Sequence, residues 1–275
     1  MSSFLTVNLN GSTAVRLYRD NRPHCLEVAQ LHKGLVLVSN GRELIEEGVG
    51  FGAPVVQYHD RTYFACSGEV FVETDSERKV LVKTFILDAI SRKKVGRSSY
   101  VNDDFYSFIH GIFHRAYVSH KTFVPFFNKV IELRKIFGVQ TDFVRVEPRG
   151  AVTARYVCLP NSVEVEVSLL KLGKVGCREI LILNEQGATH FRKYSDTDGV
   201  TLIDDEIGAW ETVKAEEAYL MDVDDRLSFS LRRVDGTELF RGREETPGRF
   251  SWAGFGYSLS PNVSNFKYVI RLENA

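Results

Sequence analysis

The sequence predicts an all-β protein, mainly antiparallel, built as a large two-sheet sandwich with one substantial helix. Three observations support this prediction. Apolar and polar residues alternate with a period of two over many short stretches, tight-turn dipeptides separate these stretches, and helices do not alternate regularly with strands. The last observation disfavours a parallel α/β fold. Because composition does not change along the chain and no linker stands out, residues 1–275 are predicted to form a single domain.

The first third of the chain is typical of successive hairpins. Apolar residues occupy alternate positions over 5–9, and Asn10-Gly11 then provides a tight turn. The same dipeptide, Asn40-Gly41, follows the apolar stretch 35–39. Residues 55–58 and 62–66 flank His59-Asp60-Arg61, and residues 80–87 form a further alternating stretch. We therefore expect short antiparallel strands throughout this part.

Strand patterns resume in the second half. Val163, Val165 and Val167 alternate with polar residues, which predicts one buried and one solvated face. The continuously apolar run 180–183 is typical of a strand buried on both faces. Strands 227–234 and 237–240 are expected around the turn Asp235-Gly236, and alternating residues 266–272 form the last strand.

One segment, Thr122 to Phe137, is predicted to be helical. Thr122 is a suitable cap, and Pro125 stands in the first turn, where its missing N–H costs nothing. Apolar residues follow at helical spacing, and Gly138 is a natural stop. A weaker segment, 206–218, is compatible with a short helix or with a polar excursion.

Composition excludes several classes of protein. The chain has 35 Lys and Arg against 36 Asp and Glu, a net charge of -1, so it has no long-range field for nucleic acid or an anionic membrane. No signal peptide and no membrane-length apolar run is found, which predicts a cytoplasmic protein without membrane contact. The four cysteines form no Cys-x-x-Cys pair and are expected to be reduced.

No cofactor and no metal is expected. Gly48, Gly50 and Gly52 are followed by Pro54 and a strand rather than a helix, so they favour a bulge or a close strand crossing over a phosphate-binding loop. The nucleophile elbow of serine hydrolases and the P-loop are both absent. Isolated histidines such as His190 are interpreted as structural or surface residues.

Two stretches resemble a known family. The run Gly48-Val49-Gly50-Phe51-Gly52-Ala53-Pro54-Val55-Val56, with the hairpin from Tyr58 to Phe64 after it, is similar to the openings of galactose mutarotase-like β-sandwiches. The closing Trp252-Ala253-Gly254-Phe255-Gly256-Tyr257 and the final alternating strand fit the same family. The resemblance implies a large β-sandwich of a kind often found in sugar epimerases, polysaccharide lyases and glycan-binding domains. It transfers no catalytic residue.

The pair His110 and His114 is the first candidate for chemistry. A spacing of four places both side chains on one face of a helix or of a strand. Such a pair suits acid–base work or hydrogen bonding to a sugar, and less well a metal, because Gly111 stands where a zinc protease has Glu. The alternative is two partly exposed histidines without chemistry.

The segment from Arg241 to Tyr257 is the second candidate. It offers charged groups for hydroxyls and aromatic faces for the C–H surface of a sugar. We take Glu244 or Glu245 as a catalytic base, His110 or His114 as the acid, and Arg115 or Arg243 as holding the sugar, with Trp252 and Tyr257 as further contacts. The alternative is that the aromatic residues fill the core.

The sequence therefore predicts a carbohydrate-associated β-sandwich, related to sugar epimerases or polysaccharide lyases, with a carbohydrate as its partner. The alternative is a non-catalytic glycan-binding or structural and interaction protein. The fold does not decide between enzyme and binding module. The enzyme hypothesis expects His110 or His114 to lie on the same concave surface as residues 243–252.

Overall fold

The computed structural model describes residues 4–19, 22–23, 30–31, 34–46, 48–74, 79–95, 140–222, 227–246 and 250–274. It divides into two compact units, residues 1–89 with 147–275, and residues 90–146. The described part of the second unit is the end of β9 (Lys79–Val95) and β10 (Gln140–Val146), which pair. All later statements concern the first unit. The prediction of a single domain over 1–275 stays a prediction.

The described strands form one sheet of 19 strands and a separate hairpin, β3–β4. Their bounds are β1 Phe4–Asn10, β2 Thr13–Tyr18, β3 Arg22–Pro23, β4 Gln30–Leu31, β5 Leu35–Ser39, β6 Arg42–Glu43, β7 Gly50–Tyr58, β8 Thr62–Thr74, β11 Ala151–Leu159, β12 Ser162–Ser168, β13 Cys177–Gln186, β14 Phe191–Asp196, β15 Thr201–Ile203, β16 Glu211–Thr212, β17 Glu217–Asp222, β18 Leu227–Arg232, β19 Thr237–Thr246, β20 Phe250–Leu259 and β21 Asn265–Asn274.

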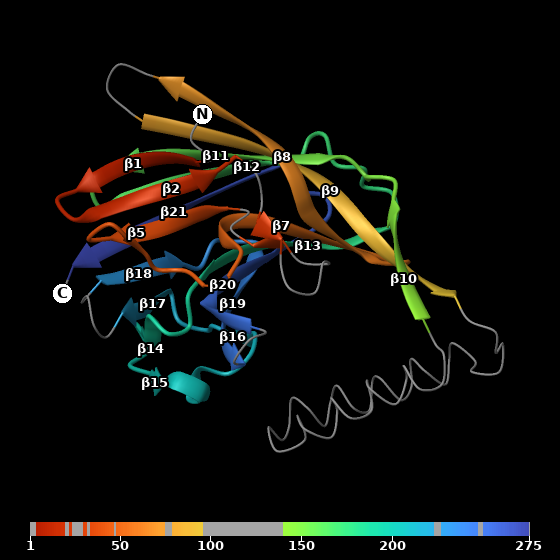
Figure 1. The fold of residues 1–275 in the computed structure, drawn as a ribbon. Helices are drawn as coiled ribbons and strands as arrows, with labels where there is room; N and C mark the ends of the chain where they lie inside the picture. Colours follow the sequence, from red (N-terminus) through yellow and green to blue (C-terminus); the bar gives the residue numbers. More distant parts are fainter. Residues whose placement is uncertain are drawn as a thin grey trace. The chain divides into compact units, whose positions relative to one another are not determined.

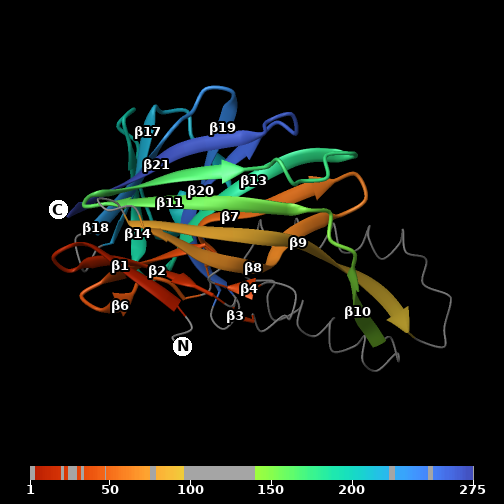
Figure 2. The ribbon, with the colours of Figure 1, turned by 90° about the horizontal axis from the view of Figure 1, so that it is seen from above.

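The all-β, mostly antiparallel prediction is confirmed (Figure 1). One layer contains, in hydrogen-bonded order, β8, β9, β11, β12, β21, β18, β17, β14 and β15. In Figure 2, strands β9, β11 and β21 of this layer lie in that order. The other layer contains β1, β2, β5, β7, β13, β20, β19 and β16.

The two layers are parts of one folded sheet rather than two separate sheets. Strand β8 pairs with β7 through Thr62–Phe64 and with β9 through Phe64–Thr74. A register shift between Ala65 and Ser67 lies where β8 leaves one partner for the other. Such irregularities bend a strand, which lets it pass from one layer to the next.

A second bulge, at Gly52, turns β7 toward the core. On β13, Leu183 pairs with Ala53 while the next residue, Asn184, pairs with Phe51, so Gly52 is the extra residue. Its φ of +78° is open to glycine but costly for other residues. The bulge re-aims Phe51, which is fully buried with its ring 5.1 Å from that of Phe229. The expected bulge in this glycine-rich stretch is therefore confirmed.

Buried side-chain hydrogen bonds connect the layers at this bulge. As the bulged residue, Gly52 has no partner in the β7–β13 register, and its backbone N–H donates to Asn184 Oδ1 at 3.1 Å. Tyr268 of the opposite layer donates its hydroxyl to the same oxygen at 2.7 Å. Tyr156, also opposite, donates to the Phe51 carbonyl at 2.9 Å. Each of these buried groups at the bulge thus has a hydrogen-bond partner, as burial in a low dielectric demands.

Aromatic packing fills the space between the layers. The Phe229 ring on β18 meets Phe51, Phe191 and Phe255 at centroid distances of 5.1, 4.9 and 5.6 Å, all edge to face. Because Phe51 and Phe255 belong to the other layer, these contacts show that the two layers pack face to face.

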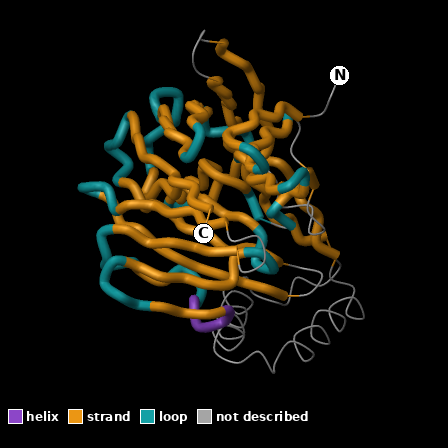
Figure 3. The backbone as a smooth tube through the Cα atoms, turned by 90° about the vertical axis from the view of Figure 1, so that its left-hand side faces the viewer, coloured by secondary structure: helices purple, strands orange, loops and turns teal. Residues whose placement is uncertain are grey.

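The helix predictions need correction. The segment Thr122 to Phe137 lies outside the described residues, so that prediction is not confirmed. The described residues contain one short 3-10 helix, η2 (Asp204–Ile207), and no α-helix (Figure 3). The weaker segment 206–218 overlaps η2 only at its start and then forms β16 and the start of β17. No helix in the described ranges is long and apolar enough to span a membrane.

We predict that Gly52→Ala lowers the free energy of unfolding by about 2–3 kcal/mol. Positive φ costs alanine about 1 kcal/mol, and the new Cβ would stand 2.8 Å from the Tyr156 hydroxyl, weakening its hydrogen bond to Phe51. Gly199→Ala is the matched control, because Gly199 has a φ of +84° with nothing within 4 Å of its Cβ position. Equal destabilisation of both variants in chemical denaturation would contradict the close contact.

Candidate functional site

Strand alternation divides the predicted residues of β19 and β20 between two faces. Glu244 pairs with Trp252, while Arg243 pairs with Ala253 and Glu245 with Ser251. Residues in register share a face, and successive residues alternate. Glu244 and Trp252 therefore lie on the outer face of the layer. Arg243 and Glu245 lie on the face that continues into the core.

Tyr257 is a core residue and not a surface for a sugar. Its side chain is fully buried, with the rings of Phe266 and Tyr268 each 5.0 Å away. Its hydroxyl donates to the Arg232 carbonyl at 2.5 Å, and burial raises its pKa. The prediction that Tyr257 contacts a sugar is therefore wrong, because its parity on β20 points it between the layers.

Arg243 is likewise withdrawn from solvent, with 2% of its side chain exposed. Its guanidinium donates to the Ala188 carbonyl at 3.1 and 3.2 Å and forms an ion pair with Glu245. It also lies 3.6 Å from Asp204 and 3.5 Å from Asp205. A buried charge is tolerated when it is paired in this way. The guanidinium of Arg243 is therefore bonded to groups of the protein itself and is not exposed to bind a sugar.

The structure that Arg243 holds is the loop before β16. The backbone N–H of Arg243 donates to the Gly208 carbonyl at 2.8 Å, which links the end of η2 to β19. Arg192 donates two hydrogen bonds to the Asp204 carboxylate, both 2.8 Å. These bonds lower the pKa of Asp204. The loop is thus fixed at both ends of the 3-10 turn.

This fixed loop presents Trp210, which sequence reasoning missed. Trp210 has a φ of +57°, a conformation that bulky residues adopt only where the surroundings enforce it. Its ring stacks on Trp252 at 4.6 Å with an interplanar angle of 17°, and 37% of the residue is exposed. Trp252 beneath it is 7% exposed. Of the two stacked rings, Trp210 is therefore the one that faces solvent.

Glycines make room for this pair of rings. A Cβ added at Gly256 would stand 3.1 Å from Trp210 Cζ3, and one at Gly242 would stand 2.8 Å from Trp252 Cη2. Gly242 on β19 pairs with Gly254 on β20, and Gly254 lies two residues from Gly256 on the same face of β20. The alternating glycines in Trp252-Ala253-Gly254-Phe255-Gly256 were the available sequence signal that something covers this face.

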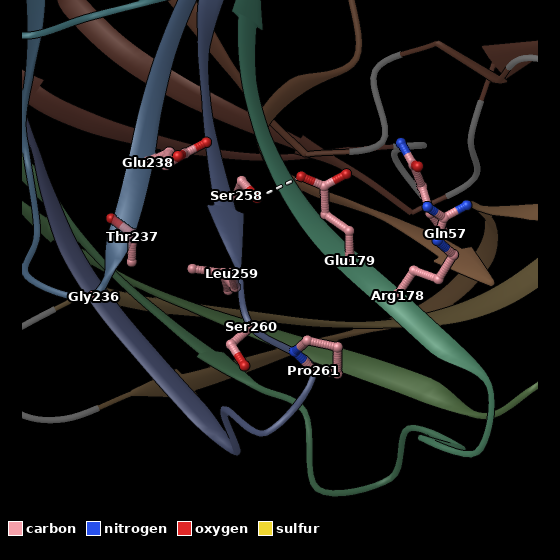
Figure 4. Close-up of a pocket in the computed structure, with 10 residues that line it drawn as sticks. All are labelled: Gln57, Arg178, Glu179, Gly236, Thr237, Glu238, Ser258, Leu259, Ser260 and Pro261. Carbon is pink, nitrogen blue, oxygen red and sulfur yellow. Dashed lines mark hydrogen bonds between the residues drawn. The ribbon is translucent and has the colours of Figure 1, made fainter. Parts of the chain in front are cut away.

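A polar depression lies on the same outer face (Figure 4). It has a volume of about 630 Å³, and its lining includes Gln57, Glu179, Glu238 and Ser258 from four adjacent strands. Glu238 pairs with Ser258, and Glu179 pairs with Gln57. The Ser258 hydroxyl donates to Glu179 Oε1. The four side chains form a polar row across β19, β20, β13 and β7, which we call the polar row.

Trp210 and the polar row are neighbours. Ser258 is two residues from Gly256, over which Trp210 lies, and two residues of a strand span about 7 Å. Gly256, Ser258 and Trp252 have the same parity on β20, so all three lie on the outer face. The aromatic face of Trp210 and the hydrogen-bonding groups of the polar row thus lie close enough together for one small cyclic molecule to contact both. No sequence signal showed that these strands are adjacent.

A second polar cluster lies where the β13–β14 loop meets β20. Glu46 accepts hydrogen bonds from Thr189 and from Ser251, the latter at 2.5 Å. His190, 5% exposed, stands 3.7 Å from both Glu46 and Asp222. This burial agrees with the structural interpretation of His190. Within the described ranges, no group of three or more His, Cys, Asp or Glu side chains is arranged to hold a metal.

The remaining predicted site residues, His110, His114 and Arg115, lie outside the described residues. Their roles, and the surface they were expected to share with residues 243–252, stay predictions.

Comparisons with known proteins find the fold but no sequence relative. No protein-family model matches the chain, and no curated protein matches it in sequence. Among solved structures, an α-N-acetylgalactosaminidase of Bifidobacterium bifidum in complex with GalNAc matches with a TM-score of 0.50 at 8% identity. The match covers 98% of this chain, which spans only 35% of that enzyme's length. At this identity the likeness shows the fold alone.

Two further matches have lower TM-scores but cover both chains almost completely. A putative aldose 1-epimerase of Escherichia coli K12 has a TM-score of 0.40 at 9% identity, with 99% of each chain covered. A galactose mutarotase-like protein of Lactobacillus casei has a TM-score of 0.41 at 10% identity, covering 98% of this chain and 99% of that one. The structural matches thus include a galactose mutarotase-like protein, the kind of protein that two stretches of the sequence resemble.

We predict that Arg243→Met lowers the free energy of unfolding by about 2–3 kcal/mol, because it leaves the buried Ala188 carbonyl without its donor and releases the 3-10 turn. The two tryptophans of the chain are Trp210 and Trp252, so tryptophan emission reports on this loop alone and should shift to the red. Lys267→Met, which removes an exposed ion pair with Glu166, is the control. An unchanged emission spectrum in Arg243→Met would contradict the clamp.

Acid should loosen the same loop. The Asp204 pKa is lowered below its ordinary 3.8, chiefly by Arg192, so the stabilisation is present at higher pH and is lost as pH falls through the lowered pKa. Asp204→Asn should reproduce the emission change at pH 7, with under about 1 kcal/mol of destabilisation because the pair is solvent-exposed. Glu166→Gln, in a comparable exposed pair, should leave the emission unchanged.

Proposed function

We propose that this protein binds a carbohydrate on the outer face of β7, β13, β20 and β19. The observation that carries the proposal is the exposed ring of Trp210 beside the polar row of Gln57, Glu179, Ser258 and Glu238. Sugars present an apolar C–H face and a rim of hydroxyl groups. An aromatic ring next to carboxylates, an amide and a hydroxyl matches both.

Each group has a distinct task in this proposal. The exposed face of Trp210, backed by Trp252, packs against the C–H face of the sugar. Glu238 and Glu179 accept hydrogen bonds from sugar hydroxyls, and charge-assisted bonds of this kind are the stronger ones. The Gln57 amide can donate to a hydroxyl or ring oxygen as well as accept. Arg243 contributes indirectly, by holding the Trp210 loop.

The charges of the depression favour a neutral sugar. Its lining contains two carboxylates, Glu179 and Glu238, against one guanidinium, Arg178. An anionic sugar would meet like charges at close range, which disfavours it. The ligand class that fits is therefore a neutral mono- or oligosaccharide.

Binding is the function that the described residues support best. Epimerisation needs a base and an acid close to the anomeric centre. The depression supplies carboxylates for the first role, while the predicted acids His110 and His114 lie outside the described residues. Anomer exchange is therefore measured in the same samples, so that an epimerase and a binding module are separated directly.

The test is a titration with a panel of neutral monosaccharides and oligosaccharides, followed by calorimetry. Trp210→Ala and Glu238→Gln should each weaken binding about tenfold or more, the loss of one good contact. Glu164→Gln, which changes an exposed carboxylate on β12 of the other layer, is the matched control and should bind as the unchanged protein does. Circular dichroism confirms that each variant is folded.

The carbohydrate proposal fails if no neutral sugar binds, or if Trp210→Ala and Glu238→Gln both bind as tightly as Glu164→Gln. Anomer exchange faster than in buffer, measured by NMR, would make the protein an epimerase. Binding without such exchange would make it a glycan-binding module.

A further inference from the structure

A second depression lies at the ends of the strands, where the loop after β12 meets the segment before β11. It has a volume of about 450 Å³ and is lined by Arg149, Gly150, Lys171, Gly173 and Val175. Its charged lining is cationic, in contrast to the polar row. Two antiparallel backbone bonds, Gly173 N–H to Arg149 O and Ala151 N–H to Lys171 O, hold its two walls together.

Arg149 is held in a defined orientation at this depression. Its guanidinium lies over the Tyr58 ring at 4.6 Å and near the Tyr63 ring at 5.4 Å. It donates one hydrogen bond within the described residues, to Asp60 at 3.0 Å. A guanidinium has five N–H groups, so most of its donors remain for a ligand. An oriented guanidinium loses little freedom when it binds an oxyanion.

Lys171 supplies a second cation. It is exposed and forms no ion pair within the described ranges. Its backbone is fixed by the bond from Ala151, and its flexible side chain can reach a ligand that Arg149 orients.

The charge balance around the depression is positive although the chain as a whole carries -1. Within the described residues, the lining contains Arg149 and Lys171 and no carboxylate. The charged residues near these two in the chain, or linked to them through Asp60, are Arg61, Lys174, Asp60 and Glu147. Asp60 is shared between Arg61 and Arg149, at 3.2 and 3.0 Å. Lys174 is tied back to the Val263 carbonyl at 2.9 Å. The cationic groups of the lining that remain for a ligand are thus Lys171 and the open edge of Arg149.

We propose that this depression, the cationic depression, is an oxyanion site for a phosphate or sulfate group, held by Arg149 and Lys171. A tetrahedral oxyanion accepts a forked pair of bonds from the guanidinium and one from the ammonium. At Gly150 and Gly173 the two walls approach each other closely: a Cβ at Gly150 would stand 2.3 Å from the Lys171 carbonyl oxygen, and one at Gly173 would stand 3.1 Å from the Arg149 carbonyl oxygen. The backbones of Arg149 and Lys171 are therefore held side by side. The site involves none of the residues proposed to bind the neutral sugar.

The experiment is an NMR titration of the full chain with inorganic phosphate, at constant ionic strength adjusted with chloride so that general screening does not change. Saturable shifts are expected for backbone amides at Gly150 and Gly173. Lys171→Gln should weaken phosphate binding about tenfold, and Arg149→Gln should weaken it further. Lys267→Gln, an exposed lysine on β21, is the matched control and should bind normally.

Separate titrations with inorganic sulfate, glucose 6-phosphate and glucose identify the source of the anion. Tighter binding of glucose 6-phosphate than of inorganic phosphate assigns the site to a phosphate ester, and equal binding assigns it to the free ion. The proposal is overturned if phosphate produces no saturable shifts, or if folded Lys171→Gln binds as Lys267→Gln does. Because phosphate binding is read at Gly150 and Gly173, failure here leaves the carbohydrate proposal untouched.

Discussion

The hydrogen bonds around Asn184 are the interaction on which the rest of the structure depends. One amide oxygen accepts the N–H of the bulged Gly52 and the hydroxyl of Tyr268 from the opposite layer. Leaving any of these buried groups without a partner costs about 1–3 kcal/mol. The core is thus stable in one register of β7 against β13 and in one docking of the two layers, because a shift in either would break several of these bonds together.

That register determines the outer face where we place the sugar. A strand alternates strictly, so placing Asn184 and Ile182 in the core places Leu181 and Glu179 outside. The neighbours follow by pairing: Gln57 opposite Glu179, and Ser258 beside Glu238. The polar row is therefore a consequence of the same alternation that builds the core, and a slip by one residue would turn it inward.

The same alternation gives the candidate carboxylates and the arginine of β19 different tasks. Glu244 shares the outer face with Trp252, whereas Arg243 and Glu245 lie on the inner face, where Arg243 joins the η2 turn to the Ala188 carbonyl. Because Arg243 is buried, its guanidinium binds the η2 loop and is not exposed to bind a sugar. Trp210 then reaches the outer face because that loop is fixed and because Gly242 and Gly256 leave space for two stacked rings.

The sequence alone determined the all-β antiparallel class, most hairpins, and a bulge or close strand crossing among Gly48, Gly50 and Gly52, since these follow from alternation and from the backbone freedom of glycine. It also placed the resemblance to galactose mutarotase-like proteins on stretches that lie largely in β7, β8 and β20. Only the tertiary structure decided which parity of each strand faces inward, and so removed Tyr257 and Arg243 from the ligand contacts. It alone brought Gln57, Glu179, Glu238 and Ser258 together. Local patterns report the period of a strand, but the partner that covers one of its faces comes from residues far away in the chain.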